Sequence, residues 1–246
     1  MVPAELIETA RRPFRAAGRF AWHFAAAKLR HDPFFSHLLA HGLIPDGARI
    51  LDLGSGQGLL AAWLMAAHAW HRDGAPGTWP GHWPAPPLLG SLHGIELTPR
   101  DIERARIGLR AHRARVQFVC DDIRAAPFPQ ADVIVACDVL HYVDADAQES
   151  VLRRIRTSLA PDGVLLLRVS DAAAGWRAGL DRAVDFGMQI ARSGRANGLT
   201  CRSEAQWLAL LDALGFNVTT RPMGDGAHEA NRLMIARLGR IGRLGR

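Results

Sequence analysis

Carboxylates stand at or near the ends of four apolar runs that have the composition of buried strands. Asp52 belongs to "ARILDL", Glu96 to "SLHGIEL", Asp121 and Asp122 follow "VQFVC", and Asp138 closes "ADVIVACD". Ligands of open parallel sheets bind at the carboxyl ends of the strands, so we expect these side chains to line one binding site. A site lined by carboxylates favours a ligand that offers hydroxyls, an exocyclic amine and a positive centre.

A glycine turn follows the first of these runs. In "LDLGSGQGLL" the residues Gly54, Gly56 and Gly58 occupy alternate positions before an alanine-rich, helix-like stretch. Glycines allow a tight turn and a close approach of the backbone to a ligand, and the start of a helix offers unpaired N–H groups. The spacing differs from the nicotinamide fingerprint, in which the third glycine comes three residues after the second. S-adenosylmethionine, with a ribose, an adenine, an ammonium and a sulfonium, fits the turn and the carboxylates better.

Alternating strands and helices must position these residues. Five strand-like runs, at residues 48–53, 91–97, 116–120, 131–138 and 164–169, are separated by helical patterns or turns. This alternation predicts an α/β fold with a doubly wound, mostly parallel sheet. The runs "NVTTR" and "NRLMIARL" are expected to add an antiparallel C-terminal hairpin, which makes seven strands, and "APDG" is expected to be a turn. Helices before the first strand are expected to form a cap.

Five motifs in order resemble the class I S-adenosylmethionine-dependent methyltransferases, which have a Rossmann-like fold. They are "LDLGSGQG", Glu96 at the end of the second strand, "CDDI", "ADVIVACDVLHYV" and "LAPDGVLLL", and the resemblance covers about residues 45–238. It implies a methyltransferase that uses S-adenosylmethionine and releases S-adenosylhomocysteine. It also implies cofactor contacts by Asp52, Gly54, Ser55, Gly56, Gly58, Glu96, Leu97, Asp121, Asp122, Ile123 and Asp138.

The resemblance gives several of these residues a role. Glu96 would accept hydrogen bonds from both ribose hydroxyls, Asp122 would accept one from the adenine amine, and Ile123 would pack on the adenine. Two alternatives stay open, because carboxylates at strand ends often serve turns. Asp121 is either a second adenine contact or a cap of the turn, and Asp138 is either a contact of the methionine end or a helix cap.

Residues 139–143, "VLHYV", carry the candidates for catalysis. Methyl transfer to a hydroxyl needs an aligned acceptor and the removal of a proton, and histidine changes charge near neutral pH. We therefore expect His141 to be a general base and Tyr142 to orient the acceptor, although either side chain could simply line or pack the pocket. No metal site is expected, because the spacing of the histidines at 68, 71, 82 and 93 matches no ligand pattern.

The domain organisation follows from the same patterns. Residues 1–44 are predicted to form a helical cap and substrate lid, and residues 45–238 the methyltransferase domain. That domain contains a loop rich in Pro, Gly and Trp at 71–91, where Trp79 and Trp83 should pack onto the protein, and an inserted lid helix at 172–200. Residues 239–246 are a basic tail.

Aromatic side chains in the cap, among them Trp22, Phe24, Phe34 and Phe35, favour a hydrophobic or aromatic acceptor over a nucleic acid base. Their alternative role is core packing. The stretches "KLRHDPFFSHLL" and "CRSEAQWLALLDALGF", with the Trp/Pro loop, are similar to methyltransferases encoded with bacterial aryl polyene pigment enzymes. That resemblance implies secondary metabolism and an acceptor presented on an acidic acyl carrier protein.

Two other functions remain open. The basic tail would suit an RNA or protein methyltransferase, but "CDVLHYV" stands where such enzymes carry an "NPPY"-like motif. A binding module that holds S-adenosylmethionine without turnover is the other alternative.

Composition indicates which partners and which cellular compartment the protein is suited to. The 246 residues carry a net charge of +6, which favours acidic partners or is simply solvated surface. The three cysteines lie far apart, which predicts reduced, buried thiols in a cytoplasmic protein. No segment approaches the length of a membrane span.

Overall fold

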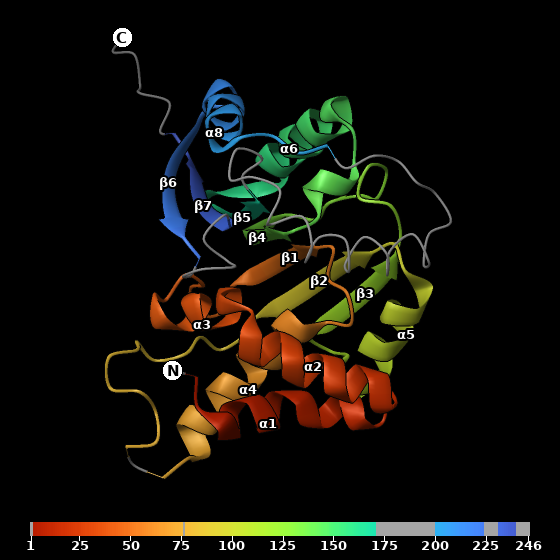
Figure 1. The fold of residues 1–246 in the computed structure, drawn as a ribbon, viewed down its shortest axis with the longest axis vertical. Helices are drawn as coiled ribbons and strands as arrows, with labels where there is room; N and C mark the ends of the chain where they lie inside the picture. The colour runs from red at the N-terminus through yellow and green to blue at the C-terminus, as the bar shows by residue number, and fades with distance from the viewer. Residues whose placement is uncertain (1, 76, 171–199, 224–230, 240–246) are drawn as a thin grey trace. The chain divides into compact units, whose positions relative to one another are not determined.

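The computed structural model describes residues 2–75, 77–170, 200–223 and 231–239, and its strands form one seven-stranded sheet in the order β3-β2-β1-β4-β5-β7-β6 (Figure 1). The pairs β1–β2, β2–β3 and β4–β5 are parallel, whereas β5–β7 and β6–β7 are antiparallel. The strands are β1 Arg49–Leu53, β2 Ser91–Glu96, β3 Val116–Cys120, β4 Ala131–Cys137, β5 Leu159–Ser170, β6 Phe216–Pro222 and β7 Asn231–Leu238. The predicted fold class is confirmed.

Helices precede and connect the strands, and some of them begin at a residue whose side chain caps the helix. Asp32 caps a helix by accepting a hydrogen bond from the Phe34 N–H at 2.9 Å, and Ser203 forms a capping box with Gln206. Thr98 also precedes a helix, but its side chain makes no capping bond. The α-helices are α1 Ala4–Arg11, α2 Arg19–His31, α3 Pro33–Ala40, α4 Leu59–Asp73, α5 Pro99–Gly108, α6 Ala145–Ser158 and α8 Glu204–Ala213. Short 3-10 helices are η1 Arg12–Arg15, η2 Arg110–His112 and η3 Leu140–Tyr142.

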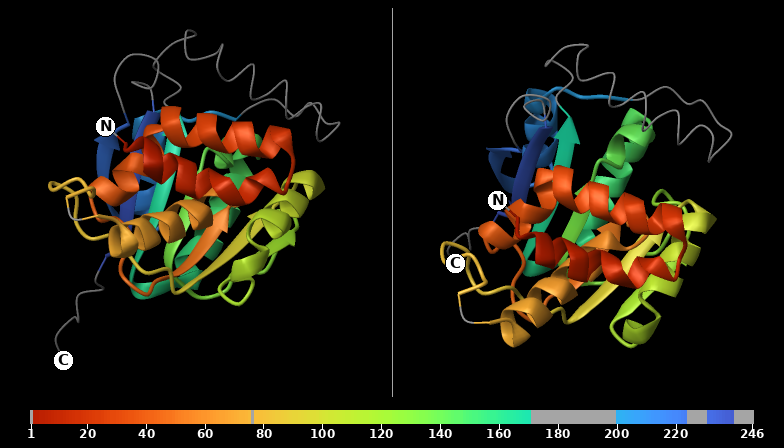
Figure 2. Two further views of the ribbon diagram at one scale, coloured as in Figure 1. Left: turned by 90° about the horizontal axis from the view of Figure 1, so that it is seen from below. Right: turned by 60° about the horizontal axis from the view of Figure 1, so that its bottom comes forward.

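The chain divides into two compact units, residues 1–129 and 130–246. In the first unit the N-terminal helices α1 and α2 lie side by side and pack with α4 (Figure 2). Helix α3 is tied to α4 by a hydrogen bond from the Trp63 indole N–H to the Phe35 carbonyl at 2.9 Å. Because Phe34 and Phe35 are 2% and 6% exposed, these two rings belong to the core, which was the alternative to a role in binding the acceptor.

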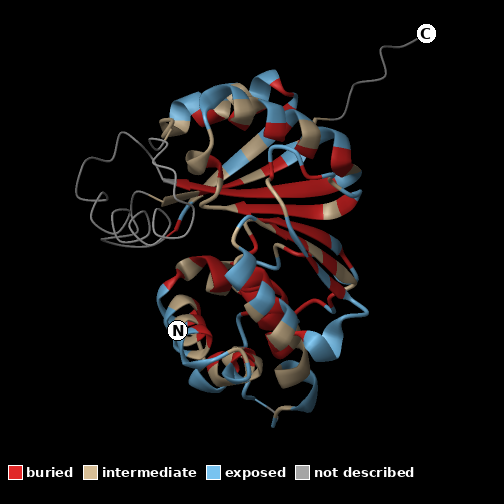
Figure 3. Ribbon diagram, turned by 90° about the vertical axis from the view of Figure 1, so that its right-hand side faces the viewer, coloured by how far each residue is buried: buried red, intermediate tan, exposed pale blue. Residues whose placement is uncertain are grey.

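In the second unit the central strands β4 and β5 are buried along most of their length (Figure 3). Strand β5 begins at Leu159, so the prediction of a separate turn at "APDG" is wrong. The pairing shifts register between Ala131, opposite Leu159, and Val133, opposite Val164. This irregularity accommodates the extra residues within the strand pair, as a bulge does.

The Trp/Pro loop is shorter than predicted, because α4 continues to Asp73 and β2 begins at Ser91. Trp79 is the centre of an aromatic cluster, with ring centroids 5.8 Å from Trp70 and 5.5 Å from Trp83. Its indole N–H donates to the Pro84 carbonyl at 3.1 Å, and Trp83 is buried. The prediction that this loop packs onto the protein is confirmed.

Three other expectations have different outcomes. The cysteines are free, but Cys120 is exposed and the other two are half-buried, so the prediction of buried thiols is wrong. Cys120 ends β3, an outer strand of the sheet, and an outer strand is covered on fewer sides. Of the described helices, none is both long and apolar enough to cross a membrane. The predicted lid helix at 172–200 and the tail at 239–246 lie almost wholly outside the described residues.

Candidate functional site

The glycine turn that follows β1 is anchored on β2. The N–H groups of Gly54 and Ser55 both donate to the Ile95 carbonyl, at 2.9 and 3.1 Å, and the Gly58 N–H donates to the Ser55 carbonyl at 2.9 Å. The turn is therefore fixed to the strand that carries Glu96. Parallel pairing sets Leu53 opposite Ile95, and Glu96 opposite Cys120, so β1, β2 and β3 end close together (Figure 1).

Glycine is needed at these three positions of the turn for different physical reasons. All have positive φ, at 74° for Gly54, 52° for Gly56 and 79° for Gly58, a conformation that L side chains rarely adopt. A Cβ at Gly58 would lie 2.7 Å from the Phe118 ring and 2.9 Å from Leu109, so this glycine also serves packing. A Cβ at Gly56 would meet no atom within 4 Å. Gly56 thus faces open space, and a ligand can approach the backbone there.

Glu96 links the turn to the start of α5. Its Oε2 accepts a hydrogen bond from the Gly56 N–H at 3.0 Å, and its Oε1 accepts one from the Thr98 N–H at 2.8 Å. The side chain is half-buried, and Leu97 beside it is 53% exposed. A carboxylate oxygen has two lone pairs, so each oxygen keeps acceptor capacity for a hydroxyl.

Asp52 is buried beneath the turn, 5% exposed. Burial, and to a smaller extent the negative charge of Glu96, raises the pKa of the Asp52 carboxyl to about 7. Asp52 therefore keeps its proton to a higher pH than an exposed aspartate does. A cation near this carboxylate would favour its ionised form.

The raised pKa of Asp52 predicts a pH dependence of stability. The folded protein binds this proton more tightly than the unfolded chain, so the free energy of unfolding should fall as pH rises from about 4 to about 7. In Asp52→Asn this contribution should be absent, and the variant should gain about 3 kcal/mol on the wild type across the window. Urea denaturation at several pH values measures the difference. If the two stabilities run parallel across the window, Asp52 does not titrate with this pKa.

The segment after β3 holds its two acids in a turn. Asp121 Oδ1 accepts a hydrogen bond from the Asp122 N–H at 2.7 Å, which is the capping role given above as its alternative. Asp122 forms an ion pair with Arg124 at 2.5 Å and accepts the Arg124 N–H at 2.8 Å. The side-chain hydrogen bond from Arg124 is the main cause that lowers the pKa of the Asp122 carboxyl. Ile123 between them is buried, at 7% exposure.

In the second unit, Asp138 lies in a strained conformation directly after β4. Its φ of 53° is the only positive value at a non-glycine residue in the described ranges. Its N–H donates to the Arg168 carbonyl at 3.2 Å, and its carboxylate accepts both Arg168 Nε, at 2.9 Å, and Arg168 Nη2. Helix η3 begins with Val139 as its capping residue and has no side-chain cap, so the alternative of Asp138 as a helix cap is wrong.

His141 and Tyr142 lie in η3, with ring centroids 4.0 Å apart. Both are half-buried, and a buried amide holds their turn in place. Gln148 Nε2 donates to the carbonyls of Leu140 and Thr200 at 3.0 and 2.9 Å, and the Thr200 N–H donates to the His141 carbonyl at 3.0 Å. The backbone that carries His141 is therefore fixed to α6.

The residues present fit an S-adenosylmethionine site. Two buried polar atoms of the glycine turn, Ser55 Oγ and Gln57 Oε1, have no hydrogen-bond partner among the described residues. Such atoms are costly unless a ligand or water satisfies them. With the open face of Gly56 and the carboxylates of Asp52 and Glu96, they suit a ligand that offers both donors and positive charge.

Sequence reasoning missed three side chains that support these positions. Gln57 and Gln148 are buried amides, and Arg168 is a cation that is 3% exposed. A lone charge inside the apolar run "VLLLRV" was a signal for Arg168. The described residues contain no group of three or more His, Cys, Asp or Glu that could hold a metal ion.

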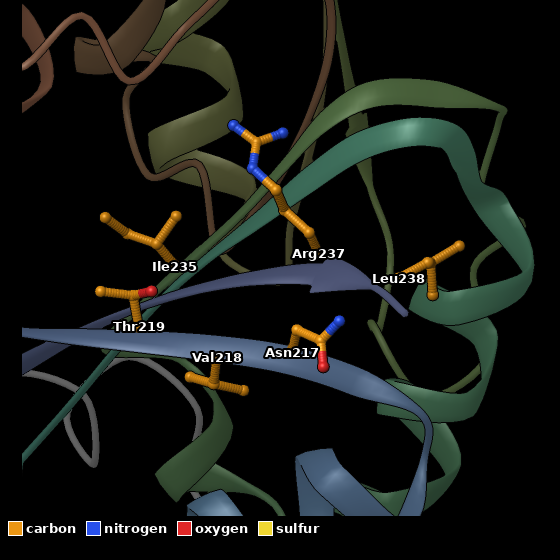
Figure 4. Close-up of a pocket in the computed structure, with 6 residues that line it drawn as sticks. All are labelled: Asn217, Val218, Thr219, Ile235, Arg237 and Leu238. Atoms are coloured by element: carbon orange, nitrogen blue, oxygen red, sulfur yellow. The ribbon is translucent and has the colours of Figure 1, made fainter. Parts of the chain in front are cut away.

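A separate hollow of about 480 Å³ lies over β6 and β7 (Figure 4). Its lining combines three apolar with three polar or charged side chains, and none of these is a predicted site residue. They are Asn217, Val218, Thr219, Ile235, Arg237 and Leu238.

Comparisons with known proteins bear on the family of this chain. A family described as a methyltransferase domain matches residues 21–221. The acetylserotonin O-methyltransferase of Mus musculus is 31% identical over 194 residues, which are 78% of this chain and 45% of that protein. The chain thus spans less than half the length of this relative.

Solved structures share the fold. The pyocyanin biosynthetic protein PhzM superposes with a TM-score of 0.59 at 19% identity, over 88% of this chain and 57% of that chain. The S-adenosylmethionine-dependent methyltransferase SibL superposes with a TM-score of 0.60 at 19% identity, over 90% and 58% of the two chains.

Proposed function

Because this chain belongs to the class I S-adenosylmethionine-dependent methyltransferases, we propose that it methylates a small aromatic or hydrophobic acceptor at oxygen or carbon. The observation that carries the proposal is the contact of Glu96 with the Gly56 N–H at 3.0 Å. This bond joins the carboxylate proposed to bind the ribose to the open glycine of the turn, so the two would contact neighbouring parts of the cofactor.

Residues of the first unit would hold the cofactor. Glu96 would bind the ribose, Asp122 and Ile123 the adenine, and the turn from Gly54 to Gly58 the amino-acid end. Bound S-adenosylmethionine supplies a methyl group on a positively charged sulfur, which a nucleophile displaces directly. The protein must then align the acceptor and, for a hydroxyl, accept its proton.

In the second unit, His141 would accept that proton and Tyr142 would orient the acceptor. Two observations support an apolar acceptor. Phe20, 45% exposed, stacks on Phe24 at 5.8 Å on the surface of α2, within the predicted cap at 1–44. In addition, a relative of this chain is named as an acetylserotonin O-methyltransferase.

We also propose that an acidic acyl carrier protein presents the acceptor. The net charge of +6 supports this pairing. Titration of the protein with a carrier protein at low and high salt tests it. Binding that weakens with salt is expected, and an absence of binding at low salt would remove the carrier from the proposal.

The decisive experiment measures cofactor binding and methyl transfer separately. Calorimetry should detect the binding of both S-adenosylmethionine and S-adenosylhomocysteine. A transfer screen should give a methylated product with phenols or carboxylates. No affinity for either cofactor would refute the proposal. Transfer to RNA alone would favour a nucleic acid methyltransferase, and affinity without transfer to any acceptor would favour a binding module.

Glu96→Ala should weaken the binding of S-adenosylhomocysteine by about 1.5–3 kcal/mol, the contribution of a hydrogen bond to a charged group. The substitution also releases the N–H groups of Gly56 and Thr98, so Glu96→Gln, which keeps an acceptor oxygen, should lose less. Calorimetry provides the affinities. Unchanged binding in Glu96→Ala would show that the ribose site lies elsewhere.

A further inference from the structure

Gln57 joins the glycine turn to the N-terminal helix α2. Its Nε2 donates a hydrogen bond to the Ala21 carbonyl at 2.9 Å, across 36 positions of the chain. The side chain is 2% exposed, and Ala21 is wholly buried. Water therefore cannot readily replace this bond when it breaks.

The conformation of the turn sets the position of that amide. Gln57 stands between Gly56 and Gly58, both with positive φ, in a turn otherwise held by main-chain bonds and by Glu96. The Oε1 atom of the same side chain is buried and has no hydrogen-bond partner in the described part of the chain, and the same holds for Ser55 Oγ nearby in the turn. A ligand that donates to these atoms would add bonds to those that already hold the turn, and would steady the Gln57 side chain in particular.

We propose that Gln57 couples cofactor binding to the attachment of helix α2. A ligand that fixes the turn also fixes the Gln57 amide, so α2 can no longer detach together with a loosened turn. By linkage, the attached helix raises the affinity for the cofactor by the same factor. This inference rests on the proposed function, because the ligand of the turn is S-adenosylmethionine.

The consequence concerns the acceptor side of the protein. Helix α2 carries the exposed Phe20 and its partner Phe24, the apolar surface that the proposed acceptor would use. Gln57 is thus a positioning residue: it touches the helix that would contact the acceptor, and its own backbone belongs to the cofactor turn. Bound cofactor would thereby help to hold the surface that the acceptor would use.

Hydrogen exchange with S-adenosylhomocysteine as the probe tests the coupling on the full chain. In the wild type, the ligand should slow exchange in the glycine turn and also in residues 19–31. The expected slowing in α2 is about fivefold, the equilibrium factor of one net hydrogen bond. In Gln57→Leu and Gln57→Met the turn should still be protected, but ligand-dependent slowing in α2 should disappear, and the affinity should fall by about the same fivefold.

Trp63→Phe is the matched control, because it removes another buried bond between helices, from Trp63 Nε1 to the Phe35 carbonyl, without touching the turn. It should speed exchange in α3 with and without ligand, and leave the affinity unchanged. Equal ligand-dependent slowing of α2 in wild type and in both Gln57 variants would overturn the coupling. So would a protected turn with no slowing of α2 in the wild type. If the ligand protects neither segment, the proposed function fails together with the coupling.

Discussion

His141→Ala should lower the rate of methyl transfer by about 100-fold or more, while the affinity for S-adenosylhomocysteine stays within about twofold of the wild type. A positioned base contributes to the rate only when the acceptor must lose a proton during the reaction. The loss should therefore be greatest below the pKa of the acceptor hydroxyl and shrink above it, where the acceptor ionises unaided. A pH profile of kcat for both proteins, with a phenol identified in the screen, measures this effect.

His112→Ala provides the control for His141→Ala, since His112 lies exposed in η2 and should affect neither rate nor affinity. Gln148→Leu adds a second comparison, because it frees the turn that carries His141 but leaves the imidazole. Its rate should fall less than that of His141→Ala. A pH profile of His141→Ala that matches the wild type would show that the base is another group or that none is needed.

Asp138→Asn should reduce the free energy of unfolding by about 3 kcal/mol, because it removes a negative charge that pairs with the buried Arg168. Arg168 is 3% exposed, so the cation cannot turn into water to recover solvation. Asparagine tolerates a positive φ at least as well as aspartate does, so this substitution separates the loss of charge from the strain of the 53° backbone angle. Asp138→Ala should reduce the free energy of unfolding by about 1 kcal/mol more, because alanine is strained at a positive φ.

Urea denaturation measures the effect of Asp138→Asn, with Glu149→Gln as its counterpart. Glu149 pairs with Arg153 at 2.5 Å on the exposed face of α6, so its loss should cost less than about 1 kcal/mol. The double variant Asp138→Asn with Arg168→Met removes both charges and should recover part of the loss. Equal losses for Asp138→Asn and Glu149→Gln would mean that burial adds nothing to this pair.

Local patterns predicted the parts of the site that depend on strand ends. Apolar runs located β1 to β4, and because parallel strands end together, the positions of Glu96 and Asp122 followed from the sequence alone. Alternate glycines likewise predicted the turn after β1. Whether each glycine faces a ligand or a neighbour could not be predicted, because the Phe118 ring that fills the space at Gly58 lies 60 positions away.

The supporting side chains were beyond sequence reasoning for a related physical reason. Gln57 meets Ala21 across 36 positions, and Gln148 meets Thr200 across 52, and no period or local spacing encodes such pairs. The start of β5 was missed because "APDG" has the composition of a turn, and only the register shift opposite Ala131 brings it into a strand. Contacts that depend on tertiary packing could be identified only in the structure.

The outer strands β3 and β6 bear on the tendency of the chain to self-associate. In β3 the Arg115 carbonyl and the Asp121 N–H bond to β2, so the Phe118 carbonyl faces outward, and there the Arg106 guanidinium donates to it at 2.7 Å. In β6, Pro222 ends the strand and has no N–H to offer. Open strand edges recruit further strands and lead to aggregates. An arginine that occupies an edge carbonyl and a proline at the opposite edge remove hydrogen-bonding groups that an added strand would need, so the sheet is terminated by its own side chains.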